Sequence, residues 1–96
     1  MSQYYVYILQ SEAADMFYIG KTENLSLRLE QHNTGFFKSS STKIADDWIV
    51  YLTIKCRSRS QSRRIEGHIK QMKSRVYIQN LKKYPAIIER LKSKYK

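Results

Sequence analysis

Two short apolar runs, both rich in aromatic and β-branched residues, lie close together near the start of the chain. Residues 4–10 (YYVYILQ) and residues 16–21 (MFYIGK) have the composition that is typical of β-strands. Only a short polar segment separates them, which predicts a hairpin and antiparallel pairing. Gly20, near the end of the second run, permits a bend or a close approach of another group. Any fold for this chain has to contain that hairpin.

The rest of the chain alternates between helical and strand-like patterns. Asn24 is a suitable N-cap for a helix over residues 25–33, and Gly35 is a natural stop for it. We expect a loop over 36–47 and a third strand over 48–54 (WIVYLTI), apolar enough to be central in the sheet or covered on both faces.

Three further helices are predicted in the second half of the chain. They cover residues 58–72, residues 74–81 and the segment that begins at Pro85. The expected apolar positions are Ile65, Ile69, Met72, Val76, Tyr77, Leu81, Tyr84, Ile87, Ile88, Leu91 and Tyr95. Gly67 interrupts the first of these helices at a cost of about 1 kcal/mol relative to alanine, and close packing is the one reason we find for it. The order β-β-α-β-α-α-α predicts an α+β domain with a small three-stranded sheet flanked by helices.

The composition limits the chain to one domain with a modest core. The chain has 96 residues, 42% of them hydrophobic, and contains no apolar run near the ~20 residues that span a bilayer. Its N-terminus lacks the basic start of a signal peptide. The lone Cys56 excludes a disulfide framework and a cysteine-rich zinc site. These features predict a reduced, cytoplasmic protein.

The positive charge is concentrated in the second half of the chain. Residues 1–54 contain four Lys or Arg against six Asp or Glu, whereas residues 55–96 contain fourteen against two. This asymmetry favours a polyanionic partner, most simply nucleic acid, over a lysine-rich face that serves solubility. The basic residues that we expect to contact nucleic acid are Arg63, Arg64, Lys70, Lys73 and Arg75.

The helix over 25–33 carries two polar residues where an amphipathic helix would have apolar ones. Positions 25, 28, 29 and 32 share one face, and they hold Leu25, Arg28, Leu29 and His32. If this helix packs on the hairpin, Arg28 and His32 point toward its tyrosines.

With these residues the chain resembles the GIY-YIG nuclease superfamily. Tyr5-Val6-Tyr7 corresponds to the first signature, with Tyr5 where the name has Gly and Val6 where it has Ile, and Tyr18-Ile19-Gly20 corresponds to the second. The resemblance continues through Lys21, Asn24-Leu25, Arg28, His32-Asn33 before Gly35, the 48–54 strand and Glu66 in RRIEGHIKQMKSR. It covers roughly residues 4–80 of one domain, with 81–96 as a helical extension. It is greatest to small, stand-alone bacterial members, which are similar to the catalytic domain of the excision-repair nuclease.

The resemblance implies a metal-dependent endonuclease that hydrolyses phosphodiester bonds in DNA, with structure-selective or weakly sequence-specific cleavage and a possible place in DNA repair. Glu66 would hold one Mg²⁺ or Mn²⁺ ion, with water and substrate phosphate as the other ligands. Arg28 suits a clamp on phosphate oxygens, because its guanidinium stays charged. Tyr7 and Tyr18 would line the site, and one of them would be the general base.

The roles of the remaining polar residues stay open at this point. A phenol needs a nearby cation to lose its proton at neutral pH, and Lys21 or the metal would supply it. His32 would bond a tyrosine or orient the attacking water, and Gly20 would have a structural role.

Two other functions have to be weighed against the nuclease. The chain could be a nucleic-acid-binding module without catalysis, which would use only the basic second half. It could also be a small interaction protein that docks through the helices of residues 74–96. Taken singly, each tyrosine is more simply a strand residue, and Glu66 is more simply a surface carboxylate paired with Arg63 or Lys70 along its helix.

Overall fold

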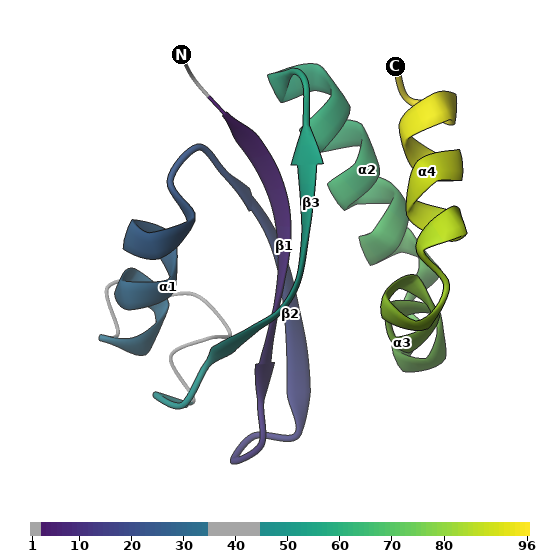
Figure 1. The fold of residues 1–96 in the computed structure, drawn as a ribbon. Coiled ribbons are helices and arrows are strands. Elements are labelled where there is room, and N and C mark those ends of the chain that lie inside the picture. Colours follow the sequence, from purple (N-terminus) through teal and green to yellow (C-terminus); the bar gives the residue numbers. More distant parts are fainter. Residues whose placement is uncertain (1–2, 35–44) are drawn as a thin grey trace.

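A three-stranded antiparallel sheet with β1 at its centre forms the middle of the molecule (Figure 1). The computed structural model describes residues 3–34 and 45–96, and it confirms the predicted β-β-α-β-α-α-α order. Strand β1 (Tyr4–Ser11) pairs with β2 (Met16–Thr22) on one side and with β3 (Ile49–Cys56) on the other. The expected hairpin is therefore β1–β2.

The third strand is not central, and that expectation was wrong. Strand β3 lies at an edge of the sheet, and Ile49 and Val50 at its start are 58% and 38% exposed. The central strand is β1, in which Val6, Ile8 and Leu9 are almost completely buried. The apolar composition of residues 48–54 did not by itself distinguish a central strand from an edge strand that helices cover on one face.

The four helices begin where their capping residues predict. They are α1 (Leu25–Asn33), α2 (Arg59–Met72), α3 (Arg75–Lys83) and α4 (Pro85–Lys94). The side chains of Asn24, Ser58 and Ser74 accept hydrogen bonds from backbone N–H groups in the first turns of α1, α2 and α3. Pro85 opens α4, as predicted. The Gly35 stop and most of the expected 36–47 loop lie outside the described residues.

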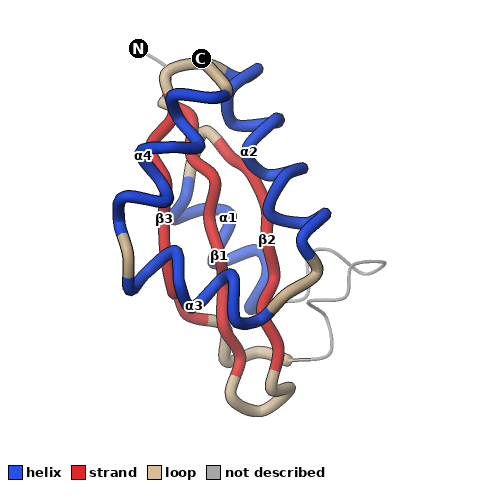
Figure 2. Tube along the Cα trace, turned by 90° about the vertical axis from the view of Figure 1, so that its right-hand side faces the viewer, coloured by secondary structure: helices blue, strands red, loops and turns tan. Residues whose placement is uncertain are grey.

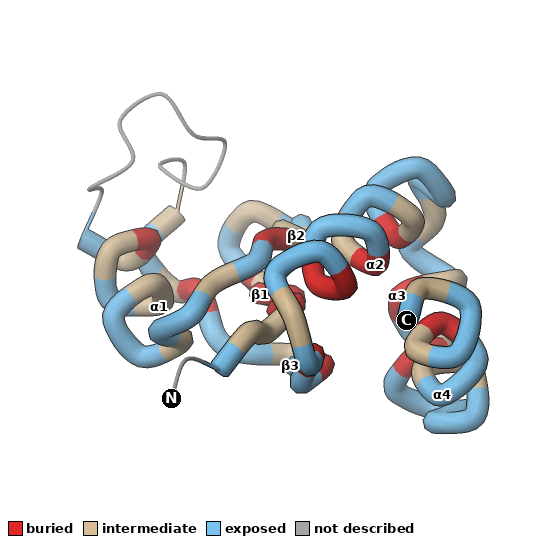
Figure 3. Tube along the Cα trace, turned by 90° about the horizontal axis from the view of Figure 1, so that it is seen from above, coloured by how far each residue is buried: buried red, intermediate tan, exposed pale blue. Residues whose placement is uncertain are grey.

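The helices form two unequal layers. Helix α1 covers one face of the sheet, and α2, α3 and α4 cover the other (Figures 1 and 3). The main core lies under the three helices and consists of Val6, Ile8, Ile54, Cys56, Ile65, Ile69, Ile78, Leu81 and Leu91. A smaller cluster of Tyr7, Leu9 and Trp48 lies under α1, where Leu25 and Leu29 pack against it. Alternate residues of β1 thus supply the two clusters.

Three details correct the expected packing. Met72, Val76 and Tyr84 were expected in the core but are 45%, 63% and 51% exposed, and Ile78 is buried instead. The chain ends α2 at Met72 and starts α3 at Arg75, so one helical stripe does not continue from Met72 to Val76. A side chain at Gly67 would have no neighbour within 4 Å, so close packing does not explain that glycine.

Asn33 fastens the end of α1 to the start of β3. Its Nδ2 donates a hydrogen bond to the Trp48 carbonyl (2.9 Å), and its Oδ1 accepts one from the Trp48 N–H (2.7 Å). These bonds hold α1 against its face of the sheet. None of the helices within residues 3–34 and 45–96 is long and apolar enough to cross a membrane.

Candidate active site

Three aromatic rings from three different elements meet under α1. Tyr7 comes from β1, Tyr18 from β2 and His32 from the last turn of α1. The ring centroid of His32 lies 4.8 Å from that of Tyr18 and 5.9 Å from that of Tyr7, and the two phenols are 6.3 Å apart. Tyr7 Oη and His32 Nε2 are joined by a hydrogen bond of 2.9 Å. The structure therefore brings together three of the residues selected from the sequence.

Gly20 provides the space in which the Tyr7 ring lies. It is the cross-strand partner of Tyr7 in the β1–β2 pairing. A Cβ atom at Gly20 would lie 2.5 Å from both Cζ and Oη of Tyr7, which is closer than real contacts allow. Gly20 thus permits a close approach, as its position in the strand predicted, and the approaching group is the phenol of the site.

Arg28 and Lys21 line an open cleft of about 450 Å³, which the three rings do not line. Arg28 connects the cleft to the ring cluster, because its charge lowers the pKa of both Tyr7 and His32. The cleft lies between the start of α1, the end of β2 and the start of α2. Its other lining residues are Tyr4, Thr22, Glu23, Asn24, Leu27, Gln31, Arg59 and Ser62. The cleft thus presents cations from α1 and β2 and has the size of a ligand site.

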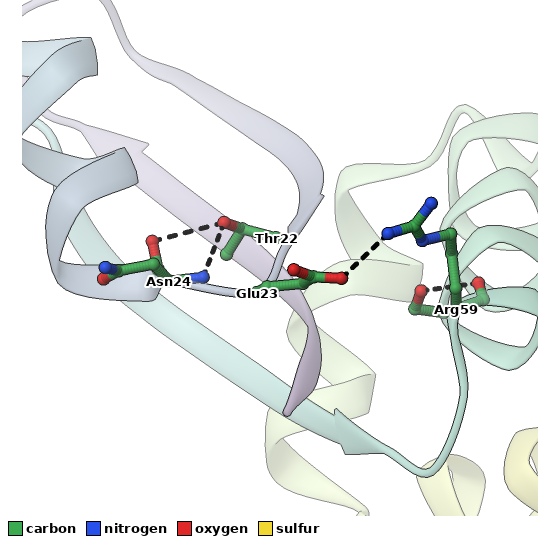
Figure 4. Close-up of polar contacts among 5 residues, drawn as sticks. Thr22, Glu23, Asn24 and Arg59 are labelled. Atoms are coloured by element: carbon green, nitrogen blue, oxygen red, sulfur yellow. Dashed lines mark hydrogen bonds and ion pairs between the residues drawn. The ribbon is translucent and has the colours of Figure 1, made fainter. Parts of the chain in front are cut away.

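Arg59 also lines this cleft, and sequence reasoning missed it. Its Nη2 lies 3.0 Å from Glu23 Oε1, so the start of α2 is joined to the connection between β2 and α1 (Figure 4). Thr22 holds that connection in place, since its Oγ1 accepts a hydrogen bond from the Asn24 N–H (3.0 Å) and donates one to the Asn24 carbonyl (3.2 Å). The position just after the Ser58 cap was the available signal, but it does not reveal a partner 36 residues away.

Glu66 comes from the other layer of helices. It lies on α2, its side chain is 15% exposed, and its Oε1 is 3.5 Å from Lys70 Nζ. The Lys70 pairing considered from the sequence is therefore present. The negative charge of Glu66 still acts on Tyr7, because it helps to raise the pKa of that phenol. This influence of Glu66 is the smallest of the four on the pKa of Tyr7.

Burial keeps Tyr7 protonated in the protein alone. It is the main reason that the pKa of Tyr7 is raised above its ordinary value; Tyr18 raises it further, Arg28 lowers it and Glu66 raises it slightly. Burial and then the positive charge of Arg28 lower the pKa of His32 below 6.5. At neutral pH the 2.9 Å hydrogen bond therefore joins a neutral phenol and a neutral imidazole. Arg28 is the cation that opposes the raised pKa of Tyr7.

Glu66 alone would have to provide the protein's carboxylate for a divalent ion. Within the described part of the chain, no group of three or more His, Cys, Asp or Glu side chains could hold a metal. One carboxylate fits a magnesium-type ion, which commonly keeps several waters and takes substrate phosphate as a ligand. It does not fit a closed structural site.

The predicted nucleic-acid contacts fall into two groups. Arg63 and Arg64 are exposed on α2. Lys70, Lys73 and Arg75 instead line a second hollow of about 280 Å³, between β2 and the junction of α2 with α3. The basic half of the chain therefore flanks Glu66 and does not form one uniform surface.

Residues 3–83 match the family model of the GIY-YIG catalytic domain. The matched segment runs from the start of β1 to the end of α3 and so includes every residue of the site described above. Comparisons with curated proteins and with solved structures find no match. Because this match covers most of the chain, the chain belongs to the GIY-YIG catalytic domain family.

Proposed function

We propose that this protein is a metal-dependent endonuclease that hydrolyses phosphodiester bonds in DNA, with structure-selective or weakly sequence-specific cleavage. Family membership supports a nuclease-type function on nucleic acid in general. The observation that carries the proposal is the meeting of Tyr7, Tyr18 and His32, from two strands and a helix, where the charge of Arg28 acts on Tyr7 and His32. Hydrolysis needs a proton acceptor for water and a cation for the developing charge, and these residues provide both kinds of group.

Arg28 is the proposed clamp on the scissile phosphate. It is half-buried and lines the open cleft, so a phosphate in that cleft would meet a guanidinium whose position α1 fixes. A guanidinium can donate two parallel hydrogen bonds to phosphate oxygens and stays charged throughout the reaction. Lys21 lines the same cleft and would add a second, more exposed positive charge.

Tyr18 is the better proposed proton acceptor of the two phenols. Tyr7 is only 2% exposed, its hydroxyl is bonded to His32, and burial raises its pKa. Tyr18 is half-buried and so retains contact with solvent. We therefore assign to Tyr7 and His32 the task of holding the site in place. Tyr18 would first release its hydroxyl proton to solvent, and its phenolate would then take the proton of the attacking water.

Glu66 is the proposed ligand of a single Mg²⁺ or Mn²⁺ ion. A divalent ion of this kind supplies charge stabilisation and lowers the pKa of bound water. An ion bound at Glu66 would compete with Lys70, whose Nζ is 3.5 Å from Glu66 Oε1. Because the Lys70 side chain is partly exposed, its ion pair with Glu66 contributes little stability, and breaking the pair costs little free energy.

The proposal is tested by incubating the full chain with branched, nicked and single-stranded DNA, and with matched RNA, in Mg²⁺ or Mn²⁺. We expect cleavage by the wild type and a loss of at least about 100-fold in Glu66→Ala. Glu89→Ala is the matched control, since Glu89 is an exposed carboxylate on α4. Equal cleavage by Glu66→Ala and wild type would refute the assignment. Salt-dependent binding without cleavage on any substrate would instead favour the non-catalytic binding module.

A further inference from the structure

Helix α2 and strand β2 lie side by side and run in opposite directions (Figure 2). An ion pair marks each end of this arrangement. Arg59 at the start of α2 bonds Glu23 just after β2, and Arg75 at the start of α3 bonds Asp15 just before β2, both at 3.0 Å. The two hollows lie at these two ends, with the first at the Arg59 end and the second at the Arg75 end.

A stripe of polar residues on α2 connects the two hollows. Its members are Arg59, Ser62, Glu66 and Lys70, whose spacings of three and four residues place them on one helical face, and Lys73 follows as the C-cap of the helix. Glu66 lies at the middle of the stripe. Lys70 and Lys73 follow it by four and seven residues, which is about 6–10 Å along a helix axis. At ~3.4 Å per nucleotide of a stacked strand, this distance corresponds to about two or three nucleotides.

The second hollow has the features of a phosphate site. Three cations, Lys70, Lys73 and Arg75, line its exposed rim, beside the apolar side chains of Met16, Phe17, Ile19, Ile69 and Ile78. The first turn of α3 opens on it at Ser74, where backbone N–H groups and the helix dipole favour an anion. Lys70 and Arg75 are paired with Glu66 and Asp15, but both pairs are partly exposed and can exchange with phosphate.

Lys73 distinguishes this hollow from an ordinary basic surface. It ends α2 in the left-handed conformation (φ 48°, ψ 41°), at a position where glycine is preferred because other residues are strained there. Its side chain is exposed, and no ion pair engages its ammonium group among residues 3–34 and 45–96. A lysine at this position is unfavourable for the fold, which points to a use for its charge.

We propose that the second hollow binds a phosphate of the substrate strand two or three nucleotides from the bond that is cut, with Lys73 as its main contact. The inference rests on the proposed function, since it takes the strand to be cut at Glu66. It assigns the strand a path along α2, from the first hollow past Glu66 to the second. Of the five predicted basic contacts, it selects the three on the rim of this hollow and leaves Arg63 and Arg64 without a role in that path.

The decisive variant is Lys73→Gly, because it separates binding from folding. Glycine relieves the left-handed strain, so we expect the melting temperature to rise by about 4 °C. Binding of labelled single-stranded and branched DNA, measured by fluorescence anisotropy in EDTA over a series of salt concentrations, should weaken about fivefold. The slope of log K against log salt should fall by about 0.7–0.9. Arg90→Gln, which removes one exposed charge from α4, is the matched control and should change binding little.

Two outcomes would overturn the inference. One is equal weakening of DNA binding in Lys73→Gly and Arg90→Gln, which would indicate a net-charge effect. The other is wild-type DNA binding by Lys73→Gly; if inorganic phosphate then stabilises the wild type but not the variant, the hollow is a site for a small anion. Because binding is measured without metal, failure here is distinct from failure of the nuclease proposal, which the Glu66→Ala cleavage assay tests separately.

Discussion

Replacing Gly20 with alanine tests whether the Tyr7 phenol has to lie across β2. The new Cβ would be 2.5 Å from Cζ and Oη of Tyr7, whereas ordinary contacts begin near 3.4 Å. The phenol would therefore have to move by the difference, 3.4 − 2.5 = 0.9 Å. The hydroxyl that moves is the one bonded to His32 at 2.9 Å, so the ring cluster would be disturbed together with the strand.

The expected size of the effect follows from two opposing terms. Overpacking of a buried site costs about 1–3 kcal/mol, and alanine regains about 0.5–1 kcal/mol through the lower entropy of the unfolded chain. We expect a net loss of about 0–2.5 kcal/mol in the free energy of unfolding. A displacement of about 1 Å in an active site reduces activity on the order of 100-fold. Gly20→Ala should therefore affect cleavage far more than stability.

Gly67→Ala is the matched control for this experiment. A Cβ at Gly67 would meet nothing within 4 Å, and Gly67 lies in the interior of α2. The change should stabilise the protein by up to about 1 kcal/mol and leave cleavage unchanged, although Gly67 is the neighbour of Glu66. Urea unfolding would give the stabilities, and cleavage of the preferred DNA would be measured well below both melting temperatures. A Gly20→Ala variant as active and as stable as wild type would refute the reasoning.

Three further predictions address the ring cluster and its support. The pKa of His32 lies below its ordinary 6.5, so the unfolded chain binds a proton more readily than the folded protein, and the free energy of unfolding should fall as the pH decreases below about 6.5. His32→Gln should reduce this pH dependence, measured by urea unfolding. The pKa of His68 is also lowered, so His68→Gln should remove a further part of the dependence. An unchanged slope in both variants would contradict this cause. Tyr7→Phe should lower the free energy of unfolding by about 1 kcal/mol, because it loses the hydrogen bond to His32. In the cleavage assay, Tyr18→Phe should lower the rate more than Tyr7→Phe does. The opposite order of rates would reverse the two proposed roles. Asn33→Ala should lower the free energy of unfolding by about 1–3 kcal/mol, because it removes both side-chain hydrogen bonds to the backbone of the buried Trp48. Gln79→Ala, on the exposed side of α3, is the control. Similar losses in the two variants would show that the link between Asn33 and Trp48 is weak.

Local chemistry explains what could be predicted from the sequence. The starts of α1, α2 and α3 follow from Asn24, Ser58 and Ser74, since each cap acts on its own first turn. The orientation of His32 toward the tyrosines followed from its place beside Leu25 and Leu29 on one helical face, and the structure confirms it. Patterns with a period of a few residues therefore identified the elements and one face of the site.

Contacts between distant parts of the chain could not be predicted in the same way. The edge position of β3 depends on which strands pair, and its apolar residues fit a centre as well as a covered edge. Arg59 acquires its place in the cleft from Glu23, and Arg75 acquires its place from Asp15, 60 residues away. An exposed arginine has no sequence pattern that reveals such a partner.

The pairing of Tyr7 with Gly20 also bears on how the β1–β2 hairpin finds its correct alignment. A slip of one residue would place Ile19 or Lys21 opposite Tyr7, and either would bring a side chain into the space that the phenol occupies in the native register. It would also turn the alternating side chains of the slipped strand toward the wrong layer of helices. The residue that leaves room for the phenol thus favours the native register over its nearest competitors. A misaligned hairpin would lose its packing and its catalytic geometry together, so selection for activity at this position is also selection for accurate folding.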